Sequence, residues 1–86
     1  MPYITRDRRR EADPRSMDWI DAENAGELNF QITCLLLSYL NNKKLSYQTI
    51  NDILGALEGA KAEFYRRIAV PYEQSKIRQN GDVYPL

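Results

Sequence analysis

The sequence predicts an all-α protein with two main antiparallel helices, about residues 25–41 and 46–70, and a short C-terminal helix. Three observations predict this fold. Apolar residues recur at helical spacing through both long segments, a good N-cap residue precedes each segment, and helix stop signals follow each.

The first helix is expected to begin after Asn24, a favoured N-cap residue. Glu27, three residues later, matches the acidic member of a capping box. Residues 41–44, two asparagines and two lysines, are expected to end the helix, because asparagine tolerates a left-handed cap and lysine suits the carbonyl end. An apolar stripe between these signals is expected to face the core: Leu28, Ile32, Leu35 and Tyr39, widened by Leu36 and Leu40.

The second helix is expected to open at the N-cap Ser46, with Leu45 and Ile50 placed as a hydrophobic staple. Pro71 is expected to break this helix and to start a shorter one, which the Asn-Gly pair at residues 80–81 would end. The stripe of the second helix is also expected to be core: Ile50, Ile53, Leu57, Ala60, Phe64 and Ile68.

This second helix is long for a chain of 86 residues. At ~1.5 Å per residue it reaches about 36 Å, more than a compact domain of this size needs. Cys34 is the only cysteine and histidine is missing, so one chain can form neither an intramolecular disulfide nor the usual zinc ligand sets. A chain this short then depends on oligomerisation for its core, and we expect a helical homo-oligomer.

Gly55 and Gly59 lie one turn apart within the long helix, where each costs ~1 kcal/mol relative to alanine. Two interpretations of this pair stand side by side. The glycines either form a smooth groove for another helix or a ligand, or allow this helix to pack against the first helix of the same chain.

Residues 1–24 are polar and are expected to form a partly ordered N-terminal arm, with residues 25–86 as the helical domain. Thr5 is placed to cap a short arginine-rich turn at residues 6–12. The cluster Arg8-Arg9-Arg10 is interpreted as a solvated arm or, alternatively, as a weak contact to nucleic acid. Twelve basic and twelve acidic residues cancel over the chain, whereas a nonspecific DNA binder usually carries a strong positive net charge.

No apolar run approaches the ~18–20 residues of a membrane span, and no hydrophobic region follows the N-terminal arginines, as a secretory signal would require. The single unpaired cysteine suits a reducing compartment. We therefore expect a cytoplasmic protein with no membrane contact and no cofactor.

Catalytic machinery is hard to assemble from this sequence. Histidine, the commonest general base near neutral pH, is missing. Glu58 and Glu63 are each followed at three or four residues by a basic residue, so salt bridges explain them. Acid–base chemistry by this carboxylate pair is the minor alternative, and we expect a non-catalytic protein.

The densest group of functional side chains lies between Lys61 and Arg67. Two adjacent guanidinium groups near a helix C-terminus can hold phosphate oxygens while a tyrosine stacks on a base. The competing interpretation is that Arg66 and Arg67 pair with Glu63 and favour the helix dipole. Tyrosine is enriched at interfaces, and the candidate ligand-binding residues are Tyr65, Arg66, Arg67, Lys61, Tyr72 and Tyr84.

Seven short strings resemble a family of short proteins from tailed phages and prophages, and together they cover nearly the whole chain. They are Met1-Pro-Tyr-Ile, Ala25-Gly-Glu-Leu-Asn, Ser46-Tyr-Gln-Thr-Ile-Asn, Gly55-Ala-Leu-Glu, Ala62-Glu-Phe-Tyr-Arg-Arg, Pro71-Tyr-Glu and Asn80-Gly-Asp-Val-Tyr. The resemblance implies a phage source and no assigned activity. Small non-enzymatic phage proteins often counter host defence, either by occluding a defence protein or by sequestering a nucleotide signal.

Three functions are therefore considered. The leading hypothesis is an oligomer that captures an anionic, nucleotide-like immune signal in the host cytoplasm. The second is a protein-interaction module that inhibits or adapts a host or phage protein, such as a host defence protein, through residues 18–27 or the surface from Tyr65 to Tyr84. The third is weak nucleic-acid binding through the arginines of residues 6–10.

Overall fold

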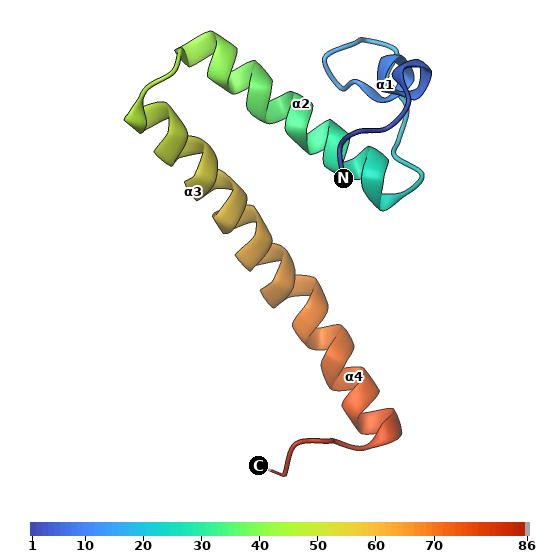
Figure 1. Ribbon diagram of the computed structural model, residues 1–86. Coiled ribbons are helices and arrows are strands. Elements are labelled where there is room, and N and C mark those ends of the chain that lie inside the picture. The colour runs from blue at the N-terminus through green and yellow to red at the C-terminus, as the bar shows by residue number, and fades with distance from the viewer. Residues whose placement is uncertain (86) are drawn as a thin grey trace. The chain divides into compact units, whose positions relative to one another are not determined.

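The computed structural model describes residues 1–85, and all its regular elements are helical (Figure 1). In chain order these elements are α1 (Arg6–Ala12), α2 (Ala25–Lys43), α3 (Tyr47–Phe64), the π-helical turn η1 (Tyr65–Ala69) and α4 (Val70–Asn80). No strand occurs among residues 1–85, which confirms the all-α prediction. The chain divides into two compact units, one ending at Ile53 and the other beginning at Leu54, and each is described by itself.

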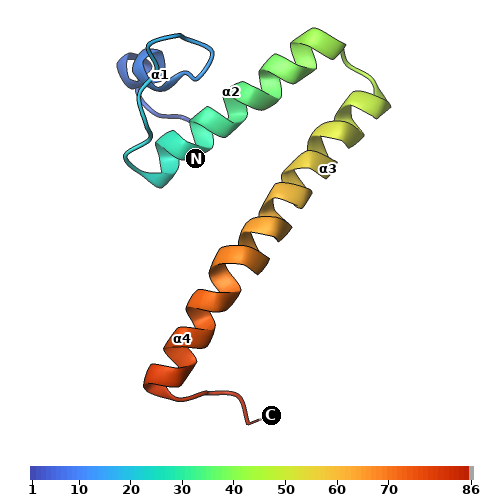
Figure 2. The same cartoon turned by 180° about the vertical axis from the view of Figure 1, so that it is seen from behind.

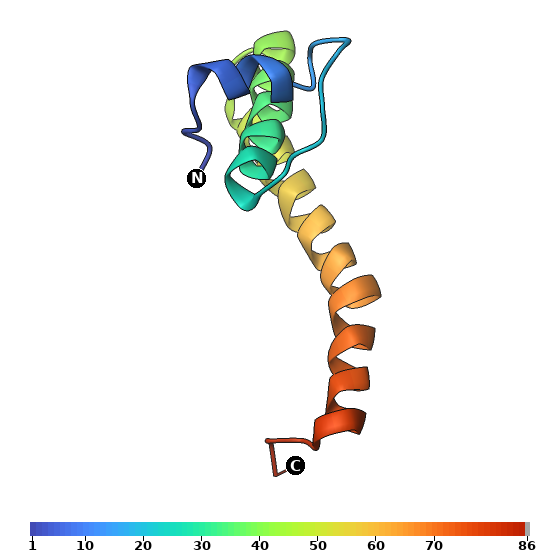
Figure 3. The same cartoon turned by 90° about the vertical axis from the view of Figure 1, so that its right-hand side faces the viewer.

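In the N-terminal unit α1 lies against α2, and Figure 3 shows it crossing that helix. Thr5 caps α1 as predicted, because its Oγ1 accepts a hydrogen bond from the Arg8 N–H at 3.3 Å. Ala12, at the other end of α1, is fully buried. Residues 1–24, expected as a partly ordered arm, thus belong to the same unit as α2.

Arg8 connects α1 to the first turn of α2. Its Nε lies 2.7 Å from Glu27 Oε2, and its Nη2 donates to Glu27 Oε1 at 2.8 Å. Its Nη1 donates to Glu11 Oε2 at 2.9 Å. The hydrogen bond from Arg8, followed by one from the Glu23 N–H, lowers the pKa of the Glu27 carboxyl. Part of the arginine cluster that was interpreted as a solvated arm therefore holds the N-terminal unit together.

The buried face of α2 is polar, so the predicted core stripe of this helix is wrong. Glu27, Gln31 and Cys34 form the buried face and are 7%, 8% and 1% exposed. Gln31 Nε2 donates to the Ile20 carbonyl at 2.8 Å, and Arg15 Nη2 lies 3.6 Å from Cys34 Sγ. The loop before α2 requires hydrogen-bond partners, and only the polar face supplies them. The predicted stripe is exposed instead: Leu28, Ile32, Leu35 and Tyr39, by 36% to 57%.

The predicted caps of the two long helices are largely confirmed. Asn24 Oδ1 accepts a hydrogen bond from the Glu27 N–H at 2.9 Å, and Ser46 Oγ accepts one from the Thr49 N–H at 3.1 Å. The end of α2 differs in detail, because Lys44, with a φ of 71°, occupies the left-handed position expected for an asparagine.

The segments α3, η1 and α4 follow one another as one continuous helix (Figure 2), so the predicted break at Pro71 is wrong. Proline lacks the N–H of an α-helical bond, and its ring would collide with the carbonyl four residues earlier. The helix widens at this point into a π turn, in which the Val70 N–H bonds the carbonyl five residues back, at Tyr65. The helix therefore continues past Pro71. It ends at Asn80 and is capped by Gly81, as predicted, with a φ of 87°.

The C-terminal unit has no core of its own. No described residue from 54 to 85 is buried. Among residues 1–85, only Ala12 and Cys34 are buried apolar residues. The stripe predicted as core is thus only partly covered within this unit: Leu57 is half-buried, whereas Phe64 and Ile68 are 65% and 55% exposed. The neighbouring Leu54 and Tyr72 are also more than half exposed, at 58% and 62%. Two buried apolar residues are fewer than a chain of this length usually has.

Gly55→Ala and Gly59→Ala are each expected to stabilise the long helix by ~1 kcal/mol. A Cβ at either position meets no atom of the C-terminal unit within 4 Å, so the methyl group adds no clash and removes backbone freedom. Circular dichroism should show a higher Tm for both variants. Gly81→Ala is the matched control and should lower Tm, because Gly81 has a φ of 87°. A lower Tm at Gly55 or Gly59 would instead identify the glycines as a contact surface.

Acid is expected to loosen the N-terminal unit between pH 3.8 and about 2. The hydrogen bonds from Arg15, whose Nη2 lies 2.8 Å from Asp13 Oδ2, lower the pKa of Asp13 from 3.8 to about 2. A carboxyl with a lowered folded pKa contributes stability above its unfolded pKa and loses it as the pH falls through the folded value. The lowered pKa of Glu27 acts with the same sign.

Trp19, in the loop between α1 and α2, is the fluorescent probe for this transition. Its emission should shift in the stated window, and Asp13→Asn should remove part of that pH dependence. Emission that stays constant down to pH 2 in the native protein would show that neither carboxylate holds the loop.

Candidate functional site

Lys61, Tyr65, Arg66 and Arg67 lie along the last turn of α3 and the π turn η1. The side chains of Lys61, Arg66 and Arg67 are 79%, 67% and 73% exposed. The structure therefore places these predicted site residues on an open helical surface, where an incoming ligand can reach them.

Glu63 is the acid that both arginines share. Arg66 Nη2 contacts Glu63 Oε2, and Arg67 Nη1 lies 3.6 Å from Glu63 Oε1. Lys61 Nζ lies 4.0 Å from Glu58 Oε1. These are the contacts that the salt-bridge interpretation predicts. Exposed pairs of this kind contribute only ~0–1 kcal/mol, so a phosphate can replace Glu63 at little cost, and ligand binding stays a prediction.

Tyr72, in the first turn of α4, and Tyr84, in the tail after that helix, lie together in a different place. Both line a surface hollow of about 330 Å³ with Lys76 and Ile77. Lys76 Nζ lies 5.5 Å from the centre of the Tyr72 ring, within the range of a cation–π contact. The six predicted residues thus form two groups, four along the helix and two around this hollow.

Sequence reasoning missed Lys76 and Ile77 as lining residues. Lys76 follows Tyr72 by four residues, a spacing that places both on one face of a helix, and this was the signal available in the sequence. Glu73 and Asp82 also line the hollow. Its charge is therefore mixed, and it is less suited to an anion than the Lys61–Arg67 segment.

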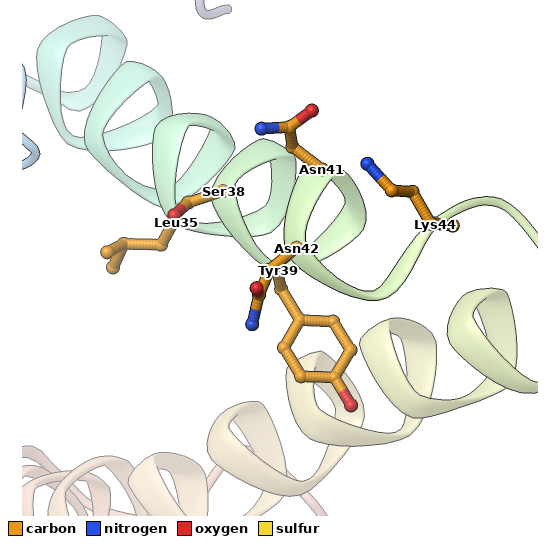
Figure 4. Close-up of a pocket in the computed structure, with 6 residues that line it drawn as sticks. All are labelled: Leu35, Ser38, Tyr39, Asn41, Asn42 and Lys44. Carbon is orange, nitrogen blue, oxygen red and sulfur yellow. The ribbon is translucent and has the colours of Figure 1, made fainter.

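A larger hollow of about 690 Å³ lies at the C-terminal end of α2 (Figure 4). Its lining side chains point to different sides of the helix, so the region is an open surface and not an enclosed pocket. Tyr39, one of them, donates a hydrogen bond from its hydroxyl to Asp52 Oδ2 at 2.8 Å. This hydrogen bond, which favours the protonated phenol, raises the pKa of Tyr39. The other lining residues are Leu35, Ser38, Asn41, Asn42 and Lys44.

Cys34 is the only thiol of the chain, and burial raises its pKa. It is therefore protonated and unreactive near neutral pH. Within residues 1–85 no three or more histidine, cysteine, aspartate or glutamate side chains gather where they could hold a metal ion. Over the same residues, no helix has both the length and the apolar character needed to cross a bilayer.

Residues 1–83 match the family described as Domain of unknown function (DUF6899). No curated protein and no solved structure matches the chain.

Proposed function

The chain belongs to the DUF6899 family, and from its own residues we propose that it is a non-catalytic binding protein that acts as a homo-oligomer and captures a phosphorylated small molecule. One observation carries this proposal: an exposed cluster of cations lies on a helix whose apolar face is only partly covered in its own unit. The resemblance to short phage proteins makes a nucleotide signal of host defence the proposed ligand, bound in the host cytoplasm.

The cations outnumber the acids beside them. Between Lys61 and Arg78 the helix carries five basic residues and two acidic ones. Arginine binds phosphate oxygens through two parallel N–H groups, and a neighbouring tyrosine can stack on a base. A symmetric oligomer repeats these groups around one ligand, which strengthens binding beyond what a single exposed arginine pair provides.

Calorimetry against cyclic dinucleotides, cyclic trinucleotides and ADP-ribose tests this function. The native protein is expected to bind one of them, and the double variant Arg66→Ala with Arg67→Ala is expected to lose binding. Arg10→Ala is the matched control, because Arg10 is 80% exposed and pairs only locally, with Asp7. No binding at high micromolar concentration, or binding that the double variant leaves intact, would contradict the proposal.

A second function, occlusion of a host or phage protein, is favoured by the uncovered stripe of α2. Leu28 and Leu35 are 53% and 57% exposed, and such side chains fit the apolar groove of a partner. A stoichiometric protein that copurifies with the native chain, and is lost in Leu28→Asp with Leu35→Asp, would support this function. Recovery of a bound small molecule without a protein partner would contradict it.

Nucleic-acid binding through the N-terminal arginines is the weakest of the three functions. Arg8 is engaged by Glu27, Arg9 Nε donates to the Ile4 carbonyl at 2.8 Å, and Arg10 pairs with Asp7. These contacts reduce the positive charge that residues 1–12 offer to a phosphate backbone. DNA affinity that is unchanged in Arg6→Ala with Arg10→Ala would exclude this function.

A further inference from the structure

We propose that the long helix pairs with the same helix of a second copy, in antiparallel orientation, around a two-fold axis beside Phe64. This inference rests on the homo-oligomer of the proposed function, and it specifies the surface, the orientation and the effect on the ligand site. The surface is the apolar face of α3, η1 and α4, formed by Leu57, Phe64, Ile68 and Tyr72.

The π turn keeps this face continuous past Pro71. In an unbroken α-helix the eight steps from Phe64 to Tyr72 would make two full turns and about 80° more. Tyr72 would then lie about 80° around the helix axis from Phe64. The additional residue of a π turn reverses this rotation by roughly 100°, so Tyr72 returns to within about 20° of the line of Phe64. Leu57, one heptad before Phe64, extends the same line toward the N-terminus.

A second copy is the occupant that matches this face in length. The helix from Tyr47 to Asn80 contains 34 residues, in segments of 18, 5 and 11, and is therefore about 50 Å long. The next longest helix of the chain, α2, has 19 residues and reaches only about 28 Å. Half-exposed apolar side chains along two such faces bury on the order of 1,000 Å² in total, the lower bound of a stable interface.

Charge complementarity selects the antiparallel orientation. Residues 47–63 carry three acids and one base, whereas residues 64–80 carry four bases and one acid. Antiparallel pairing sets the acidic half of each copy against the basic half of the other, whereas parallel pairing sets like charges together. The residues concerned are Asp52, Glu58, Lys61 and Glu63 in the first half, and Arg66, Arg67, Glu73, Lys76 and Arg78 in the second.

Full overlap of the two helices fixes the register. Gln48 of one copy then lies opposite Asn80 of the other, and the axis passes beside Phe64. The two Phe64 rings meet at this axis. One turn to either side, the small Ala60 of one copy faces the larger Ile68 of the other, a pairing of small and large side chains that fills the interface without overlap.

This pairing completes the proposed ligand site. Lys61 and Tyr65, four residues apart, lie on one flank of the Phe64 line, and Glu63 and Arg67 lie on the other. In an antiparallel pair each flank meets the same flank of the second copy. Two Lys61 ammonium groups and two Tyr65 rings therefore gather on one side of the axis, and two Arg67 guanidinium groups gather on the other, so that each side offers a phosphate paired cations that the monomer lacks.

Distances between spin labels on the ligand-free protein test the orientation. A label at Gln48→Cys is expected about 48 Å from its counterpart, and one at Gln74→Cys about 30 Å, because these residues lie 16 and 10 positions from the axis. A parallel pair would give less than about 20 Å for both labels, since paired helices lie 8–10 Å apart. Native Cys34 is only 1% exposed, and the unlabelled native chain controls for its reaction.

Native mass spectrometry of the same protein tests the surface. Phe64→Asp is expected to weaken the dimer at least about 100-fold, whereas Met17→Asp, at a residue 99% exposed in the loop between α1 and α2, should not. If Phe64→Asp loses its helix, Glu63→Lys tests the same surface, because Glu63 and Arg67 share the flank that meets its counterpart in the second copy. This variant should pair less tightly with itself than with Arg67→Glu.

A monomer at all concentrations, a short Gln48 distance, or charge variants that pair as the native chain does would overturn this inference. Nucleotide binding is measured separately, so the two proposals can fail independently. Binding by a monomer would overturn the pairing alone. An antiparallel dimer that binds no nucleotide would overturn the ligand alone.

Discussion

Arg8→Met is expected to release the N-terminal segment from α2 while the long helix stays folded. The substitution keeps most of the side-chain length but removes the guanidinium that contacts both oxygens of Glu27. Glu27 is then left 7% exposed without a counterion. Removing one partner of a buried ion pair is more damaging than removing both, because the remaining charge stays desolvated.

Hydrogen exchange is the suitable measurement, because it reports the opening of each segment separately. Protection of the α1 amides should fall at least about tenfold, and protection of the α4 amides should not change. Arg10→Met is the control, since Arg10 pairs only with Asp7 and is 80% exposed. Combining Arg8→Met with Glu27→Gln should restore part of the protection by neutralising the stranded carboxylate. Unchanged α1 protection in Arg8→Met would show that the ion pair does not hold the segment.

The parts of this fold that the sequence predicted correctly depend on local signals. Thr5, Asn24 and Ser46 each cap a helix with their own side chain, and Gly81 ends one through its own backbone angle. Neighbours within four residues decide such features, so spacing along the chain is sufficient to predict them.

The buried face of α2 could not be predicted in this way. Leucine spacing favours burial of the Leu28–Leu35 stripe, yet Gln31 is buried because the Ile20 carbonyl, eleven residues earlier, needs a donor. A loop that must satisfy its own backbone groups selected the polar face. A single sequence does not show which face such a loop will cover.

The candidate site likewise has one part that local spacing predicts and one part that depends on more distant residues. Pairing of Arg66 and Arg67 with Glu63 follows from three- and four-residue spacing and was predicted as one of two interpretations. The hollow that contains Tyr72 and Tyr84 depends on the turn of the tail after Gly81. No spacing rule within a helix reports where such a tail turns.

Pro71→Ala is expected to strengthen the helix and at the same time weaken the dimer. Alanine supplies the missing N–H and removes the ring clash that the π turn avoids, so the segment can return to regular α-helix. Proline costs ~3 kcal/mol relative to alanine in a helix interior, and the gain here is smaller because the π turn already relieves part of that cost. Helical ellipticity should therefore rise.

Without the additional residue of the π turn, Tyr72 moves about 80° away from the line of Phe64. The paired face then ends at the Phe64 turn, and the dimer dissociation constant from native mass spectrometry should rise at least about tenfold. Pro85→Ala, in the tail beyond α4, is the control and should change neither quantity. A variant that gains helix and keeps the native dissociation constant would show that the face beyond Phe64 contributes nothing to pairing. Unchanged ellipticity would show instead that the π turn is favoured by its own side chains and not imposed by Pro71.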